Sequence, residues 1–491
     1  MINFFQTNRT SKNSKGVILI NVLVFSVIAI VVTMALINWA TATLRSSKQL
    51  GAREQAFQIA EAGIDYYRWH LAHAQSDYTD GISTTTTGPF IHSFTDKDGN
   101  VLGQYALTIT PPPIGSTVVK IKSKGTVTED PKVSRTIQVT LAIPSLAKYA
   151  VAANDIMRFG EGTEIFGPIH SNDGIRFDGI AHNVITSAKD KYVDPDQGTH
   201  SPSWYQFGVY TSVNPAETNN DGTPPSTVPN RPDVFMAGRQ FPVPAIDFVG
   251  LTTNLSQMKS SAQSNGRYFA ASGAQGYYIL LKNNDTFDLY KVNSLTTASN
   301  NCTNDNQNQD NWGTWSIQNK TFMANYAFPA NGIIFLEDHV WVDGKINTAR
   351  LTIAAGKFPD SPSTRKSITV NNDLTYTNYD GQDTVALISQ GDINAGFASE
   401  DDMRIDAALI AQNGRIGRYY YSNRCGTGYS RTRVTLYGMI ASNKRYGFAY
   451  TDGTGYQTRS IIYDSNLLYA PPPNFPLTSS QYTTISWDEV K

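Results

Sequence analysis

Charged residues and cysteines are scarce in this 491-residue chain. Asp, Glu, Lys and Arg together make up 16% of the sequence, the formal net charge is -1, and there are two cysteines. Such a balance argues against a nucleic-acid-binding surface, which requires an excess of Lys and Arg. The sequence also lacks a phosphate-binding loop, a zinc-protease helix and a nucleophile elbow. We therefore expect neither an enzyme nor a resident cofactor or metal.

The most informative absence is local, because no Lys, Arg, Asp or Glu occurs between Lys15 and Arg45. Residues 17–37 are apolar at all but three positions. As a helix rising about 1.5 Å per residue, this stretch is long enough to span the roughly 30 Å of hydrocarbon in a bilayer. Basic residues precede it, which predicts a cytoplasmic N-terminus and an extracytoplasmic remainder. The sequence thus predicts a single-pass protein of the cytoplasmic membrane.

Nothing in the sequence breaks the helix after the apolar run. From Leu50 to Leu71 apolar residues recur at steps of three and four, which is typical of an amphipathic helix. We expect one helix over residues 17–76, with 17–37 as its transmembrane part. A secretory signal peptide has a shorter apolar core and a cleavage site after it. A plain membrane anchor remains an alternative.

The order of these parts resembles the N-terminus of type IV pilins and pseudopilins, minor pilins above all. The resemblance rests on Lys15-Gly16 before the apolar helix and on the Ala-Glu-Ala-Gly segment at residues 60–63. It implies that a prepilin peptidase removes residues 1–16, which leaves Val17 as the first mature residue. It also implies that the helix contacts other pilin subunits.

Asn21 is a departure from the family pattern. Most pilins carry Glu at this fifth mature position, where it pairs with the free amine of a neighbouring subunit. A neutral amide costs less in lipid than a carboxylate but offers no ion pair. The tip pseudopilin of type II secretion also lacks this Glu. The resemblance therefore indicates a minor or tip subunit.

Residues 77–145 contain four segments with strand-like alternation, and the first two flank a turn signal at residues 96–100. A long helix followed by antiparallel strands predicts an α+β unit in which the sheet lies on the apolar stripe of the helix. This is also the layout of a pilin-like module.

The remaining sequence predicts a mainly β domain. Short apolar segments with Gly, Asn or Asp nearby recur in residues 146–185 and 331–491. They favour an irregular β-solenoid, with a β-sandwich as the alternative. Residues 186–330 are interpreted as an insertion of loops, a helix and a hairpin. Cys302 and Cys425 could pair outside the cell, but their spacing leaves this open.

Two groups of residues are candidate sites. Aromatic rings near Lys444 and Arg445 suit contact with a surface glycan or protein, and ordinary β packing is the alternative. A dense acidic group is a weak candidate for calcium, with a solvated loop as the alternative. The aromatic candidates are Tyr419, Tyr420, Tyr421, Tyr446, Phe448 and Tyr450, and the acidic ones are Glu400, Asp401, Asp402 and Asp406.

These observations support one principal hypothesis about function. The chain is expected to be a non-enzymatic minor or tip subunit of a type IV pilus-type filament, with a large extracellular β head for assembly or adhesion. A membrane-anchored surface adhesin outside any filament is the alternative. A carbohydrate-active β-helix enzyme is a third possibility, which fold analogy alone does not support. The ligand and the type of filament remain open.

Overall fold

The computed structural model describes residues 15–82, 86–113, 116–197, 204–217, 223–248, 250–306, 309–478 and 481–490. The chain forms two compact units. The first unit contains residues up to 110, residues 120–140 and the C-terminal residues from 484. The second contains residues 111–119 and 141–483. The first unit is therefore built from segments that are far apart in sequence.

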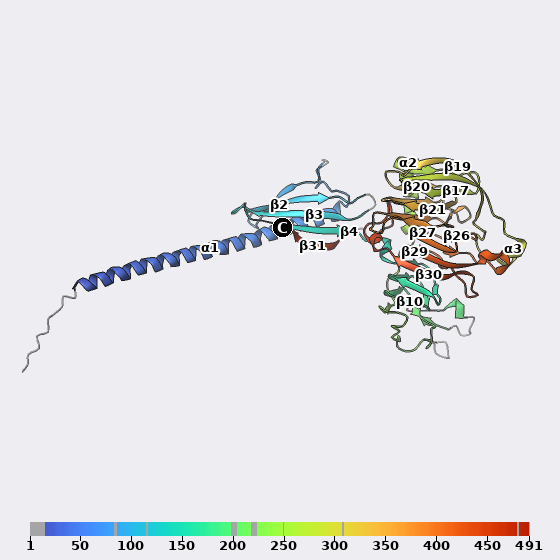
Figure 1. Cartoon of the computed structure of the whole chain (residues 1–491), viewed down its shortest axis with the longest axis horizontal. Coiled ribbons are helices and arrows are strands. Elements are labelled where there is room, and N and C mark those ends of the chain that lie inside the picture. Colours follow the sequence, from blue (N-terminus) through green and yellow to red (C-terminus); the bar gives the residue numbers. More distant parts are fainter. Residues whose placement is uncertain are drawn as a thin grey trace, which may run out of the picture. The chain divides into compact units, whose positions relative to one another are not determined.

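A single helix, α1 (Lys15–His73), opens the first unit, and its 59 residues make it roughly 90 Å long. Figure 1 shows it continuing well beyond the sheet of that unit. Its side chains are exposed over residues 18–51, whereas one face over residues 56–71 is buried. Among the described residues it is the helix long and apolar enough to cross a membrane. The uninterrupted helix expected from the sequence is present.

The buried face of α1 packs on a five-stranded sheet in the order β1-β2-β3-β4-β31, in which β1, β2 and β3 pair antiparallel. Glycine makes the close approach possible, since a Cβ at Gly125 would collide with the Ala56 carbonyl oxygen of α1. The structure thus contains the long helix and antiparallel sheet that the sequence predicts. The strands are β1 (Phe90–Thr95), β2 (Val101–Thr110), β3 (Val119–Val127), β4 (Ser134–Ala142) and β31 (Thr483–Val490).

The C-terminal strand β31 corrects the predicted domain division, which assigned residues up to 491 to the second domain. Trp487 packs edge-on against Phe57 of α1, with ring centroids 5.7 Å apart. Glu489 forms an ion pair with Arg135 of β4. Strand β31 therefore belongs to the first unit, because its side chains complete the packing of the helix and sheet.

The second unit is built around a ladder of parallel strands, each paired with the next. Successive pairs run down this unit from β20 to β29 and on toward β10 (Figure 1). In spatial order the strands are β16 (Arg267–Phe269), β20 (Ile333–Leu336), β22 (Arg350–Ala355), β25 (Thr384–Ser389), β27 (Asp402–Ala411), β29 (Ser430–Ser442), β5 (Val151–Ala153), β8 (Ile169–Ser171), β11 (Ile185–Ser187) and β15 (Arg239–Gln240).

The chain enters this ladder in its middle. It leaves β5 toward β15, resumes at β16, and returns so that β29 pairs in parallel with β5. Residues 239–295 thus contribute strands to the ladder and its hairpin. The prediction that residues 186–330 are only an insertion is wrong. Strands β15 and β16 lie within this range, and they form the two end strands of the ladder.

Further parallel ladders join the neighbouring coils of the chain. Successive coils of this unit therefore pair in parallel, alongside the antiparallel hairpin strands described below. These strands are β6 (Met157–Phe159), β7 (Thr163–Phe166), β9 (Ile175–Phe177), β10 (Ile180–Ala181), β14 (Val209–Tyr210), β17 (Gly276–Leu281), β21 (Val340–Ile346), β23 (Ile368–Thr369), β24 (Leu374–Tyr376), β26 (Ile393–Ala395), β28 (Ile416–Arg418) and β30 (Gly455–Tyr463).

Antiparallel pairing in the second unit includes β17 with β18 (Thr286–Leu295), β18 with β19 (Ile317–Ala327), and β12 (Lys191–Tyr192) with β13 (Gln206–Phe207). Helix α2 (Gly250–Asn265) lies beside β20 at one end of the ladder (Figure 1). Met258 of α2 belongs to a buried cluster with Ala354 and Ala386, so the helix covers the outer face of the ladder.

A continuous aliphatic stack forms the core of this unit. At equivalent register positions, eight successive strands place an aliphatic side chain on the inner face, and all eight are fully buried. Each such side chain stabilises the fold by roughly 1.5–3 kcal/mol. We call this set the inner stack, and its members are Ile334, Ile353, Leu387, Leu409, Ile440, Val151, Ile169 and Ile185.

Candidate functional site

The expected processing and assembly positions lie at the start of α1. Lys15, Gly16 and Val17 fall in its first turn, and residues 1–14 of the expected leader lie outside the described residues. Asn21 is exposed one turn further on. The apolar side chains around it are exposed and form an apolar surface along this part of the helix. They include Ile18, Leu19, Leu23, Phe25, Val31 and Leu36, each more than half exposed.

Of the six aromatic residues proposed as a possible ligand surface, two have partly exposed side chains. Tyr420 and Tyr450 are partly exposed and lie edge to face, with ring centroids 5.1 Å apart. The prediction of an exposed surface is corrected at the other four positions. These rings are at most 6% exposed because they pack against arginine side chains and other rings; they are Tyr419, Tyr421, Tyr446 and Phe448.

A disulfide joins Cys302 of α3 (Asn300–Asn306) to Cys425, with Cα atoms 4.5 Å apart. Next to this bond, Gln309 and Trp312 donate hydrogen bonds to the Tyr420 carbonyl oxygen. The bond therefore fixes the segment after α3 against the loop that carries the tyrosines. This explains the burial of Tyr421, whose hydroxyl donates to the Gly313 carbonyl oxygen at 2.8 Å.

The four acidic candidates do not converge on one point. Asp402 pairs with Arg433, while Asp401 accepts hydrogen bonds from Thr432. Asp406 is fully buried and accepts from Arg404 Nε at 2.8 Å. Burial raises the pKa of Glu400, and the charge of nearby Asp373 adds to this shift. Within the described ranges no set of three His, Cys, Asp or Glu side chains has a metal-binding arrangement.

A groove of about 1080 Å³ in the second unit is lined in part by the predicted aromatic residues Tyr446, Phe448 and Tyr450. We call it the arginine groove. Its walls come from the β6, β9 and β28 regions and from loops near residues 196, 212 and 450. Its charged lining consists of Arg158, Arg176, Arg415, Lys444, Arg445, Arg459, Asp155, Glu161, Asp178 and Asp196.

At one wall of the arginine groove, two guanidinium groups share one carboxylate. Arg158 Nη1 and Arg445 Nη1 each lie 3.2 Å from an oxygen of Asp196. Hydrogen bonds from Arg445 and then Arg158 hold the pKa of Asp196 below its usual range. The backbone N–H of Arg445 donates to Asp155 Oδ2 at 3.1 Å. Two carboxylates, Asp155 and Asp196, therefore lie at the wall that carries these two guanidinium groups.

Arg176 is better compensated. Its Nε donates to Asp178 Oδ2 at 2.7 Å, and the Ser212 backbone N–H donates to Asp178 Oδ1 at 2.8 Å. Arg459 differs, since it donates to neutral oxygens among the described residues, including the Glu161 carbonyl at 2.7 Å. Lys444 lies 3.6 Å from Asp310, with 56% of its side chain exposed. Six cationic side chains and four carboxylates line the groove, and three further carboxylates, Asp194, Asp310 and Asp392, act on Arg176, Lys444 and Arg415.

Two buried polar atoms at the groove find no partner among the described residues. They are the hydroxyl of Tyr446 and Nε of Arg415. Burial raises the pKa of the Tyr446 hydroxyl, so it stays protonated and can donate. A buried donor without a partner costs roughly 1–3 kcal/mol. A ligand that accepted these hydrogen bonds would recover that free energy.

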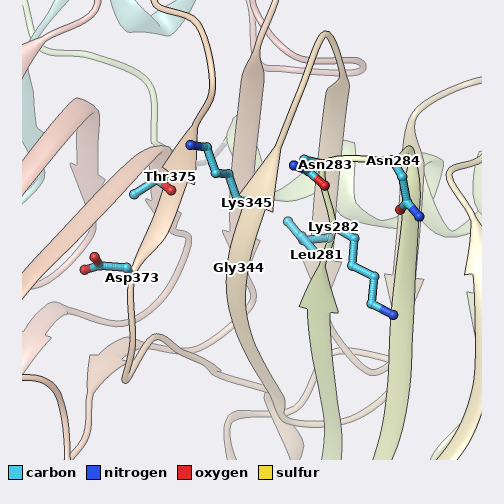
Figure 2. A pocket seen from close by; sticks show the side chains of 8 residues that line it. All are labelled: Leu281, Lys282, Asn283, Asn284, Gly344, Lys345, Asp373 and Thr375. Atoms are coloured by element: carbon cyan, nitrogen blue, oxygen red, sulfur yellow. The ribbon is translucent and has the colours of Figure 1, made fainter.

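A second pocket, of about 510 Å³, lies beside the turn between β17 and β18. Figure 2 shows Lys345 directed toward Thr375, whereas Lys282 points away from Asp373. Its polar groups diverge, which makes it a weaker candidate than the arginine groove.

Sequence reasoning singled out Lys444 and Arg445 but missed the other cations of the groove. Arg158, Arg176 and Arg459 stand in three different coils, up to 301 positions apart in sequence. Each is a single basic residue in a short strand or at its edge, which is ordinary for a β protein. No local signal marks them, because coil stacking brings them together.

Comparisons with known proteins give little further information. No family model and no curated protein matches the chain. Among solved structures, the chain is similar to the competence-associated pilin ComZ from Thermus thermophilus, at 14% sequence identity and a TM-score of 0.28. The match covers 89% of this chain and 98% of that one. A TM-score this low carries no argument about this chain.

Proposed function

We propose that this chain is a non-enzymatic minor or tip subunit of a type IV pilus-type filament. One observation carries the proposal, namely the division of α1 into two parts. Residues 56–71 pack into the sheet of the first unit, whereas the apolar residues 18–50 are exposed. Exposed apolar surface on this scale is stable only in lipid or against other helices.

The exposed half of α1, residues 18–50, occupies lipid and a helix bundle in turn. The helix first spans the cytoplasmic membrane, and it then packs among the helices of other subunits. Asn21 supports a minor or tip position, since its amide gives no ion pair to a neighbouring amine. The β-rich second unit is then presented outside the cell, for assembly or adhesion.

Mass spectrometry of the protein extracted from cells tests the processing step. We expect a mature chain that begins at Val17, because prepilin peptidase would cleave after Gly16. The variant Gly16→Val should remain unprocessed yet stay in the membrane fraction. Gly51→Ala serves as a control, since Gly51 lies in the same helix with open space around it. An intact Met1 in the unmodified protein would rule out this processing.

A membrane-anchored adhesin outside any filament is the second candidate, and the same exposed helix supports it. Immunogold labelling of the second unit separates the two. Label on filaments or at their ends supports the subunit, and label confined to the cell body supports the anchored adhesin. Two results would be needed to support an enzyme. The purified chain would have to cleave a glycan, and the double variant Asp401→Asn, Asp402→Asn would have to lose that cleavage.

A further inference from the structure

We propose that the arginine groove binds a segment of an acidic polysaccharide, whose sugar carboxylates pair with the guanidinium groups. The inference rests on the proposed function only in that the second unit is presented outside the cell. The volume of about 1080 Å³ exceeds the range of about 300–1,000 Å³ typical of small-molecule pockets. The ligand class therefore follows from the charged lining, since a volume near the upper limit of that range fits a small molecule as well as a segment of polymer.

The charges of the groove indicate an anionic ligand. Six cationic side chains and four carboxylates line it. Asp196 is shared between Arg158 and Arg445, and the guanidinium of Arg459 contacts neutral oxygens. Guanidinium groups bind carboxylates through paired, charge-assisted hydrogen bonds. A ligand carboxylate beside Arg459 would pair with a guanidinium group that donates only to neutral oxygens among the described residues.

The mixture of charges favours a uronic acid polymer over a nucleic acid. A nucleic-acid strand carries one phosphate about every 3.4 Å, and its binding sites are strongly basic. Here Asp155, Glu161 and Asp178 lie among the cations and would repel closely spaced phosphates. A polyuronate has one carboxylate per sugar with hydroxyl groups between. Those hydroxyls can donate to the groove carboxylates.

Titration calorimetry of the full chain in detergent micelles tests the inference. The probe is a short oligogalacturonate, and its methyl ester of the same length removes the charge and keeps the shape. We expect saturable binding of the acid, and binding of the ester weakened by about tenfold or more. Short duplex DNA is titrated in parallel at the same salt concentration, because ionic strength alone changes the affinity of both polyanions.

Variants assign the binding to the groove. Lys444→Gln combined with Arg158→Gln should weaken binding of the acid by about fivefold or more, since two cations are lost. Lys345→Gln is the matched control: it removes one exposed charge of the second unit outside the groove and should change nothing.

Three results would overturn the inference. The first is equal affinity of the protein for the acid and for its ester. The second is the absence of saturable binding of the acid. The third is that the protein binds DNA more tightly than the acid and that Lys444→Gln with Arg158→Gln abolishes the DNA binding. The last would assign the groove to nucleic acid. None of them bears on cleavage after Gly16, which mass spectrometry measures, so failure of this inference and failure of the proposed function can be told apart.

Discussion

Replacing Leu387 by alanine tests whether the inner stack stabilises the second unit. Leu387 is fully buried, in register between Ile353 of β22 and Leu409 of β27. Loss of a core leucine costs the transfer free energy of the removed atoms plus the cost of the cavity, about 2–5 kcal/mol in all. Strand β25 is paired in parallel on both sides, so its neighbours cannot easily close the gap. We expect a loss of about 3–4 kcal/mol in the free energy of unfolding.

Hydrogen exchange followed by mass spectrometry on the full chain measures this loss by region. A loss of about 3 kcal/mol corresponds to a roughly 150-fold fall in protection from exchange. Peptides from β22, β25 and β27 should show it. Peptides from residues 56–71 of α1 should not, because they belong to the other compact unit.

Two control variants make the result interpretable. Leu387→Met keeps the volume and should cost less than about 1.5 kcal/mol. Lys345→Ala alters an exposed residue of β21 and should stay within about 0.5 kcal/mol. A fall in protection of less than about fivefold for Leu387→Ala would contradict the tight packing of the stack. An equal loss in α1 would contradict the independence of the two units.

Three further predictions concern other parts of the chain. Cys302→Ser opens a disulfide that spans 123 positions, and should lower the stability of the second unit by about 2–5 kcal/mol in non-reducing denaturation. Gly125→Ala should lower the stability of the first unit by about 1–3 kcal/mol in thermal melts, because the new Cβ would collide with the Ala56 carbonyl oxygen. Gly51 lies in open space on the helix, so Gly51→Ala should instead raise that stability by up to about 1 kcal/mol. Although partial burial opposes it, hydrogen bonds from Thr79, Gly81 and His70 lower the pKa of Asp77 to about 2. This carboxylate therefore stabilises the folded state above about pH 4, and the stabilisation is lost as the pH falls toward 2. It amounts to about 1 kcal/mol after solvent screening. The Asp77→Asn variant should lack this pH-dependent part of the free energy of unfolding in an acid titration.

The candidate site shows where sequence patterns stop being informative. The crowding of aromatic and basic residues in the sequence marked the segment around residue 446, and the structure places it on the arginine groove. It could not show which rings are buried, because Tyr421 is covered by a segment more than 100 positions away in sequence. Nor could it connect Arg158 with Arg445, which meet only through Asp196.

The sequence by itself determined α1 and the first strands of its sheet. A helix is specified by residues three and four apart, and the absence of charge from 16 to 44 is visible without any partner. The alternation of β3, with Val119 and Ile121 buried and Lys120 and Lys122 exposed, is likewise local. These elements can be predicted from the sequence because the periodicity that specifies each one lies within its own residues.

Only the tertiary structure decided how the coils are ordered. Strands of three to five apolar residues look alike in sequence, so nothing marked β29 as the partner of β5, or β31 as part of the first sheet. Those pairings join segments hundreds of positions apart in sequence. They form because each strand still has an apolar face to bury after the local elements have folded, and the pairing buries it. The arginine groove is a product of that stacking.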